Sequence, residues 1–347
     1  MMEKASERPD CPDCPDRPDR PDRPDQSDQP ARSDRRMVAS WLPVPARDAH
    51  KYRRGRALLV AGSRAYPGAA VLAARAAQRM GAGYVELAVP DGLEASFAVA
   101  APSLVVHGRH DWQSRWRADG AGPAGAPANG VEEPPLRAIC VGPGFDAQGD
   151  VDESRSLVLQ ALSCPVPVLV DGGGLTALCD AEGLRLVRRR FERGLDTVLT
   201  PHAGEAARLA ACVGLEGSAA EAEDAPDCRA LDLARAWGAV VCLKGPDTYV
   251  AAPARSQEAF PGASALPVRA MRWGGPELAK AGTGDVLAGM IAGLMAQGTP
   301  ASRAAFAGAC VHALAGSEAA RRGSVVSVIP EDVLDALPAA LNALLMS

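Results

Sequence analysis

The sequence predicts an α/β protein with a mainly parallel central sheet and helices on both faces. Three observations lead to this fold class. Short, largely apolar segments with β-branched residues recur along the chain, as expected for strands that are buried on both faces. Helical segments lie between most of them, and turns rich in glycine and proline follow the strands. This alternation favours parallel strands joined by helical crossovers.

The chain divides into a tail rich in proline, aspartate and arginine and a longer region with the composition of a folded domain. Residues 1–40 repeat an x-Pro-Asp triplet with almost no apolar residue, so we predict a disordered tail in which nothing offsets the entropy of ordering. Residues 41–347 are predicted to form one domain. Within it, residues 119–135 and 253–266 are rich in glycine, alanine and proline and are expected to be loop insertions.

The expected elements can be placed in order. Helices are predicted at 68–80, 205–211 and 228–237, and two more follow at the C-terminal side, one after Gly282 and one from Pro330. Gly81 and Gly83 close the first of them. The expected strands are 56–61, 84–89, 138–141, 166–170, 197–199 and 240–243.

Composition excludes several classes of function. A net charge of -5 and an aromatic content of 4% argue against a nucleic-acid surface. No apolar run is long enough to span a membrane, and the N-terminus has no apolar signal core. Nine cysteines without zinc-like spacing suggest reduced thiols. We therefore expect a cytoplasmic protein that binds neither nucleic acid nor membrane.

The most informative segment is LAKAGTGDVLAGMIAGL, residues 278–294, in which a glycine-rich turn leads into an apolar helix. A helix N-terminus offers unpaired N–H groups and a positive dipole, and Gly282 and Gly284 let the backbone approach an anion. We call residues 282–285 the anion turn. Asp285 either caps this helix or takes a proton from a substrate hydroxyl beside the anion.

Five further glycine-rich segments follow expected strands, and one of them carries a lysine. They are GSRAYPGAA (62–70), VGPGF (141–145), DGGG (171–174), LTPHAGE (199–205) and, with its lysine, LKGPDT (243–248). Each alone could be a simple turn, because Gly, Pro and Asp dominate turns. Together, at the carboxyl ends of parallel strands, they indicate one shared ligand site.

These motifs resemble those of the ADP- or ATP-dependent NAD(P)H-hydrate dehydratases, which have a ribokinase-like fold. The resemblance extends from His50 to the final helix at Pro330. It implies repair of hydrated NADH or NADPH (NADHX and NADPHX, S epimer) at the expense of a nucleotide. The nucleotide implied is ADP in bacterial members, with AMP and phosphate released, and Mg²⁺ is expected with the phosphates. No dedicated metal site made of protein groups is expected.

The resemblance also implies site residues. Asp285 would be the base for the substrate hydroxyl and would contact the hydrate. Gly282, Thr283 and Gly284 would form the anion hole. The remaining hydrate contacts would be Ala69, Gly144 and His202, although His202 could instead be a local hydrogen-bonding group at the start of a helix. The nucleotide would be held by Lys244, Gly245, Pro246, Asp247, Thr248 and Gly284.

Other expectations concern partners and alternatives. The family members imply a homo-oligomer, a tetramer, and epimerisation by another protein, because the tail is too short for the epimerase domain fused to some relatives. Gly275 stands where the family often has asparagine, so one polar contact is missing. His312 is expected to be a packed core residue. The alternatives are a ribokinase-like kinase of a small hydroxymethyl or hydroxyethyl heterocycle, and a non-catalytic adenine-nucleotide sensor.

Overall fold

A single sheet runs through the centre of the computed structural model, which describes residues 32–51, 53–115, 136–146, 149–215, 225–253 and 268–346. In this described part nine strands pair in the order β3-β2-β1-β4-β5-β6-β7-β8-β9. The pairs from β3 to β7 are parallel, and β8 and β9 are added antiparallel at one edge. The predicted mainly parallel α/β sheet is confirmed.

The strands that were predicted lie within two residues of their expected bounds. Three strands, β3, β8 and β9, were not predicted; β3 and β9 are only half-buried over three of their four residues. The strands are β1 (Arg56–Val60), β2 (Tyr84–Val89), β3 (Val105–Gly108), β4 (Leu136–Val141), β5 (Val168–Val170), β6 (Thr197–Leu199), β7 (Val240–Leu243), β8 (Thr248–Ala251) and β9 (Val268–Met271).

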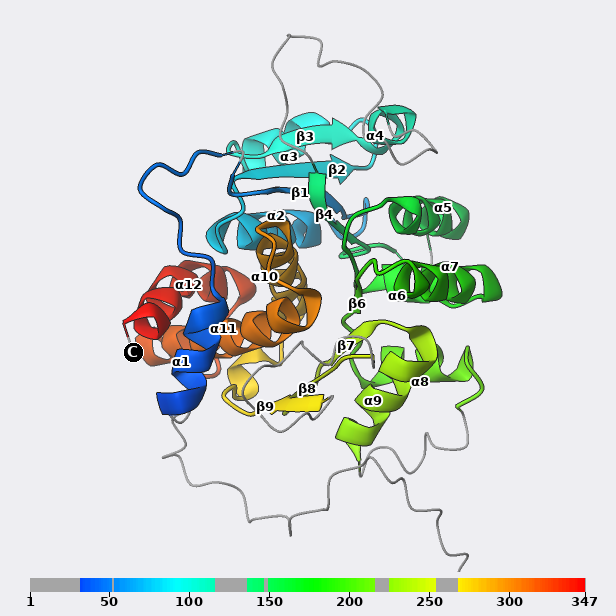
Figure 1. Cartoon of the computed structure of the whole chain (residues 1–347). Helices are drawn as coiled ribbons and strands as arrows, with labels where there is room; N and C mark the ends of the chain where they lie inside the picture. The colour runs from blue at the N-terminus through cyan, green and yellow to red at the C-terminus, as the bar shows by residue number, and fades with distance from the viewer. Residues whose placement is uncertain are drawn as a thin grey trace, which may run out of the picture.

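Helices cover both faces of the sheet (Figure 1). One face is covered by α1 (Arg32–Trp41), α2 (Pro67–Arg79), α10 (Thr283–Ala296), α11 (Ala301–Arg322) and α12 (Pro330–Leu345). The other is covered by α5 (Val151–Ser163), α6 (Gly173–Leu178), α7 (Ala181–Glu192), α8 (Ala203–Ala211) and α9 (Pro226–Trp237). Near β3 lie α3 (Glu94–Ala100) and α4 (Arg109–Arg115), and a short 3-10 helix, η3 (Pro276–Leu278), precedes α10.

Close packing of α10 against α2 fixes where α10 begins. Gly289 and Gly293 of α10 face the backbone of Ala73 and Ala77 of α2, and a methyl group on either glycine would overlap a carbonyl oxygen or crowd it. Small residues therefore let the two helices approach closely. Because both helices begin at the carboxyl edge of the sheet, this contact positions the turn at the start of α10 against the loop at the start of α2.

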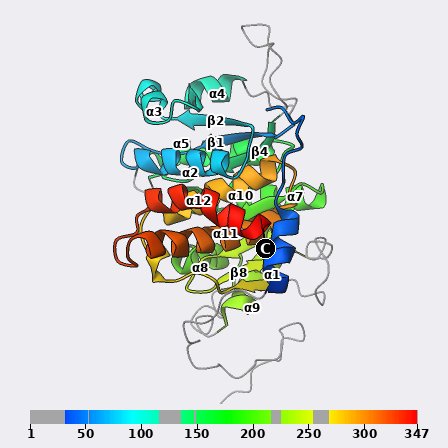
Figure 2. The same ribbon diagram turned by 90° about the vertical axis from the view of Figure 1, so that its left-hand side faces the viewer.

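The N-terminal boundary differs from the prediction. Helix α1 spans Arg32–Trp41, and its residues Val38 and Trp41 are buried against α11 and α12. Trp41 meets Phe306 edge to face, with ring centroids 6.2 Å apart. The C-terminus lies next to α1 (Figures 1 and 2). The fold thus begins before residue 41, because three apolar residues among the charges of this segment pack onto the core; residues 1–31 lie outside the described part.

The structure bears only in part on the two predicted loop insertions and on the expected absence of a membrane span. Most of both insertions, residues 119–135 and 254–266, lies outside the described part. Among the helices that the structure describes, we find none with the length and apolar character needed to cross a bilayer.

Candidate active site

The carboxyl edge of the sheet brings together a lysine and two carboxylates. Lys244 directly follows β7, and its Nζ lies 2.8 Å from Oδ1 of Asp171 and 3.9 Å from Oε2 of Glu205. The Thr200 hydroxyl donates to the same Asp171 oxygen at 2.6 Å. Asp171 and Glu205 were not predicted as site residues, although both stand in the strand-end motifs. They are buried, so they hold a charged lysine at the edge where a ligand is expected.

Two opposing effects act on the pKa of Lys244. Burial lowers it, but the negative charges of Asp171 and Glu205 and the hydrogen bond to Asp171 outweigh burial, so the pKa is raised. The ammonium group therefore remains protonated at neutral pH. An ammonium group has three donors, so one that bonds to Asp171 can still present donors to a phosphate.

The anion turn lies directly beside this lysine. A Cβ on Gly284 would be 3.5 Å from Nζ of Lys244. Gly282 has φ 96°, the left-handed conformation that glycine tolerates best, and its Cβ position is occupied by Pro330 and Leu72. The first turn of a helix has N–H groups without intrahelical partners, so Gly284 and Asp285 present such donors next to a cation. This is the combination that a phosphate requires.

One predicted donor of the anion hole is turned inward. The Thr283 N–H donates to the Lys280 carbonyl at 3.3 Å, and its hydroxyl donates to the carbonyls of Lys280 and Leu278 at 2.8 Å each. Thr283 thus holds the turn in shape through its own backbone and side chain. The contribution of Gly282 and Gly284 to an anion hole remains a prediction.

Asp285 has a strongly perturbed carboxyl group. Burial raises its pKa to about 7; the negative charge of Asp171 adds to this, Lys244 opposes it, and Glu205 adds a smaller increase. A general base works best when its pKa lies near the working pH. The N-cap position of α10 is occupied by Gly282, and Asp285 lies one turn further in, as the third residue of the helix. Its perturbed pKa supports the base interpretation, which stays a prediction.

His202 takes the local role that was left open. Its Nδ1 accepts hydrogen bonds from the N–H groups of Gly204 (3.0 Å) and Glu205 (3.4 Å) at the start of α8. Glu205 returns the bond by accepting from the His202 N–H at 2.8 Å. This reciprocal cap fixes the direction of both side chains. The imidazole is 57% exposed, so it can still face a ligand, and its contact with the hydrate remains a prediction.

Ala69 and Gly144 meet where the first and fourth strands end. Gly144 has φ 69°, and a Cβ there would lie 2.6 Å from the methyl carbon of Ala69 and 2.8 Å from the Tyr66 carbonyl. The loops are also joined by a hydrogen bond of 2.8 Å from the Gly62 N–H to the Pro143 carbonyl. The structure thus brings together two residues predicted to contact the hydrate, in a wall that only small residues can form.

The turn between β7 and β8 carries the other predicted nucleotide residues. Residues 244–248 connect the two antiparallel strands, with Gly245 and Pro246 at the bend and Thr248 buried at the start of β8. Asp247 is engaged at the surface by Arg272 (3.3 Å) and by the Tyr249 hydroxyl (3.4 Å). The turn is adjacent to the anion turn through Lys244.

Two residues behind the anion turn add contacts that the sequence did not indicate. His312 of α11 is buried as predicted, but its ring also hydrogen-bonds the backbone of Thr283, and burial lowers its pKa to about 4. Near Gly275, where the family's asparagine is missing, the buried Glu277 accepts from the Gly275 N–H at 3.2 Å. The Glu277 carboxylate thus bonds the backbone at Gly275, which has no side chain of its own.

The acidic groups suit a magnesium ion that arrives with phosphates. Among the described residues no group of three or more potential ligands is arranged to hold a metal. Magnesium in nucleotide sites usually takes one or two carboxylates together with waters and phosphate oxygens. Asp171 and Glu205 are the carboxylates paired with Lys244 beside the anion turn, and they fit that use.

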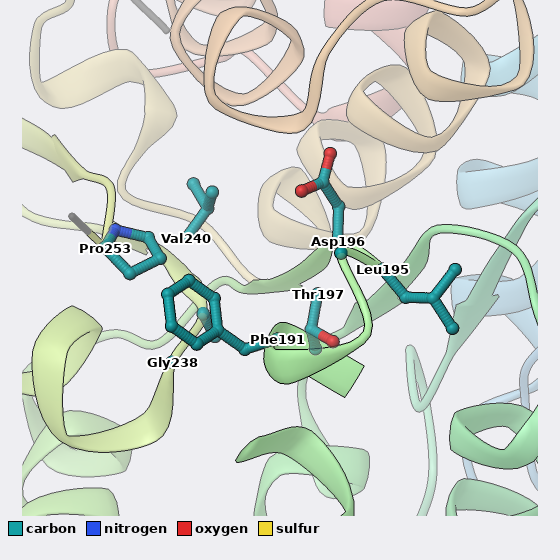
Figure 3. Close-up of a pocket in the computed structure, with 9 residues that line it drawn as sticks. Phe191, Leu195, Asp196, Thr197, Gly238, Val240 and Pro253 are labelled. Atoms are coloured by element: carbon teal, nitrogen blue, oxygen red, sulfur yellow. The ribbon is translucent and has the colours of Figure 1, made fainter. Parts of the chain in front are cut away.

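A pocket elsewhere in the structure does not belong to this site. It lies at the amino ends of β6 and β7, on the edge opposite the anion turn, with Phe191, Val240 and Pro253 on one side and Leu195 on the other (Figure 3). Its volume of about 200 Å³ is below that of most ligand pockets, about 300–1,000 Å³. Asp196, which also lines this pocket, accepts a hydrogen bond from the Ala301 N–H at the start of α11.

The carboxyl edge of this parallel sheet combines a carboxyl group with a pKa of about 7, a charged lysine and a helix N-terminus, which is an arrangement typical of enzymes that act on phosphorylated ligands. Comparison with known proteins is more specific. A family model for the NAD(P)H-hydrate dehydratases matches residues 57–339, and the chain belongs to that family.

Relatives and solved structures agree with this. The ADP-dependent (S)-NAD(P)H-hydrate dehydratase of Xanthomonas campestris is 36% identical over 87% of this chain and 93% of its own length. A bifunctional NAD(P)H-hydrate repair enzyme of Salinibacter ruber is 38% identical over 87% of this chain, which spans 51% of that protein. The ADP/ATP-dependent dehydratase of Bacillus subtilis, co-crystallised with ATP and Mg²⁺, aligns with a TM-score of 0.67 at 25% identity, covering 88% of this chain and 96% of that one. The ribokinase-like fold is confirmed.

Proposed function

We propose that this protein dehydrates the S epimers of NADHX and NADPHX with ADP as co-substrate, yielding NADH or NADPH, AMP and phosphate. The observation that carries the proposal is Asp285, whose pKa of about 7 and place at the start of α10 suit a base acting beside a bound phosphate. The ADP-dependent Xanthomonas relative supports the choice of nucleotide.

Asp285 would accept the proton of the hydroxyl at C6 of the hydrated ring. The hydroxyl oxygen then attacks the terminal phosphorus of ADP, and the bond to the bridging oxygen breaks with release of AMP. The ring nitrogen expels the resulting phosphate from C6, and loss of a proton from C5 restores the double bond. Phosphate leaves more readily than hydroxide, so the phosphoryl transfer is what makes dehydration feasible.

The other residues of the site would bind and orient. Lys244 and the N–H groups of Gly284 and Asp285 would stabilise charge on the transferring phosphoryl group. Ala69, Gly144 and His202 would line the hydrate side, and residues 244–248 the nucleotide side. Magnesium, bound with the nucleotide near Asp171 and Glu205, would neutralise part of the phosphate charge.

The test is incubation of the purified protein with NADHX or NADPHX and either ADP or ATP, followed by the absorbance of reduced nicotinamide. One reduced nicotinamide should form for each phosphate released, and nucleotide consumption should depend on the hydrate. A stable phosphorylated pyrimidine or thiazole, with no response to the hydrates, would instead identify a ribokinase-like kinase. ATP bound without turnover of any substrate would identify a nucleotide sensor.

Cellular context completes the proposal. Without a described membrane-spanning helix, the protein is proposed to act in the cytoplasm, where its cofactors are used. A separate epimerase would supply the S epimer, since bifunctional relatives are about twice as long as the matched region. A homo-oligomer, a tetramer, is proposed, and its mass can be measured by light scattering.

A further inference from the structure

Arg109 lies at the carboxyl edge of the sheet, just after the edge strand β3, and it is only 3% exposed. Its Nη2 donates to the Gly62 carbonyl in the loop between β1 and α2. Its Nη1 lies 2.9 Å from Oε2 of Glu153 on α5. The guanidinium carbon is 4.8 Å from the centroid of the Phe145 ring, in the loop that follows β4. One side chain thus joins three segments that are far apart in sequence.

These contacts concern the two loops that form the hydrate wall. Gly62 begins the loop that leads into the first turn of α2, where Ala69 lies, and Phe145 directly follows Gly144. Ala69 and Gly144 are in tight contact, so a small shift of either loop would change the space between them. Arg109 contacts both loops from the side of the edge strand β3. Lys244 and the nucleotide turn lie toward β9, which is the edge strand at the other end of the strand order.

Stability alone does not explain this arrangement. Burial of the guanidinium lowers its pKa, and Glu153 only partly opposes that effect. The Nε atom is buried and has no hydrogen-bond partner among the described residues. A buried donor without a partner is unfavourable, so this arginine is held in a position that does not satisfy its own hydrogen bonding. That position is the one from which it reaches Gly62 and Phe145 together.

An arginine is the residue that such a link requires. Its planar guanidinium can donate in two directions and stack on a ring at the same time, whereas a lysine offers a point charge without a stacking plane. We propose that Arg109 is a positioning residue that holds the two hydrate-binding loops in register and thereby sets affinity for the hydrate, but not for the nucleotide. This inference rests on the proposed dehydratase function.

The experiment compares Arg109→Lys with a matched control, Arg190→Lys. Arg190 is an equally buried arginine, but its five hydrogen bonds go to Leu162, Cys164, Val166, Asp196 and Thr197 at the opposite edge of the sheet. Both variants should lose thermal stability. Only Arg109→Lys should raise KM for NADHX, by roughly tenfold, with KM for ADP within twofold of the wild type.

A second measurement does not depend on catalysis. Amide hydrogen exchange of residues 62–70 and 142–145 should be at least several-fold faster in Arg109→Lys and unchanged in Arg190→Lys. If Arg109→Lys does not fold, Glu153→Gln keeps the arginine but weakens its anchor, and the same two readouts should move in the same direction by a smaller factor.

Equal changes of both KM values, or the same KM pattern in both arginine variants, would overturn the proposal. Unchanged exchange in the two loops would overturn it as well. An inactive wild type with faster loop exchange in Arg109→Lys would refute the dehydratase function while leaving the loop contact supported.

Discussion

Replacing Asp285 with asparagine should lower turnover and, at neutral and alkaline pH, stabilise the fold. The amide has nearly the same shape but cannot accept the hydroxyl proton. Loss of a general base typically costs a factor of about 10²–10⁴ in rate, so turnover should fall within that range while the affinity for ADP, measured by calorimetry, is retained. The opposite effect on stability follows from the pKa of the carboxyl group.

The sign of the stability effect can be worked out from linkage. The pKa of Asp285 is raised from 3.8 to about 7, so between these values the folded protein binds more protons than the unfolded chain. The free energy of unfolding therefore falls as pH rises from about 4 to 7, and the whole loss is present above pH 7. The two pKa values correspond to an upper limit of about 4 kcal/mol. Because the side chain is only partly buried, we expect about 1–3 kcal/mol.

Thermal melts of the wild type and Asp285→Asn between pH 4 and pH 9 measure this directly. The variant should melt several degrees higher at pH 8, since about 1 kcal/mol shifts the melting temperature by about 2–4 °C in proteins of 150–250 residues. The difference should disappear near pH 4. Asp335→Asn is the control, because that carboxylate is 78% exposed on α12 and its loss should give no pH-dependent gain.

A variant that retains near wild-type turnover would refute the role of Asp285 as base. A variant that is less stable than the wild type at pH 8 would refute the raised pKa of the partly buried Asp285 carboxyl group. The pH profile of kcat/KM for the wild type adds an independent readout, since activity should rise with pH through about 7.

Three other outcomes are expected. Lys244→Met should weaken ADP binding more than hydrate binding, and it should also destabilise the fold by about 3–5 kcal/mol because Asp171 is left buried without its cation; calorimetry and melting curves check both. Trp41→Ala should cost about 3–5 kcal/mol of stability with unchanged KM values, as measured by denaturant unfolding and kinetics. His312→Asn should lose less stability than the wild type as pH falls from 6.5 to about 4, because the wild-type ring must stay neutral when the unfolded chain takes up a proton; urea unfolding at both pH values checks this.

Predictions from the sequence succeeded where the signal is local. The strands β1, β2, β4, β5, β6 and β7 are short apolar runs, and their burial on both faces follows from that pattern. Helix α10 follows from its apolar run after a glycine-rich turn. Helix α1 was missed because its apolar residues Met37, Val38 and Trp41 are separated by charges and polar groups, so they are recognised as core only once α11 and α12 lie beneath them.

The sequence by itself determined the parallel α/β architecture, the strand-end motifs and the family, because apolar periodicity, turn residues and motif spacing are local properties of the chain. Only the tertiary structure decided which charges face each other. Asp171, Glu205 and Lys244 are separated by up to 73 residues, and their pairing raises or lowers pKa values only through burial and distances of a few ångströms. The same holds for Arg109 and His312, whose positions behind the site depend on how three or more separate elements pack.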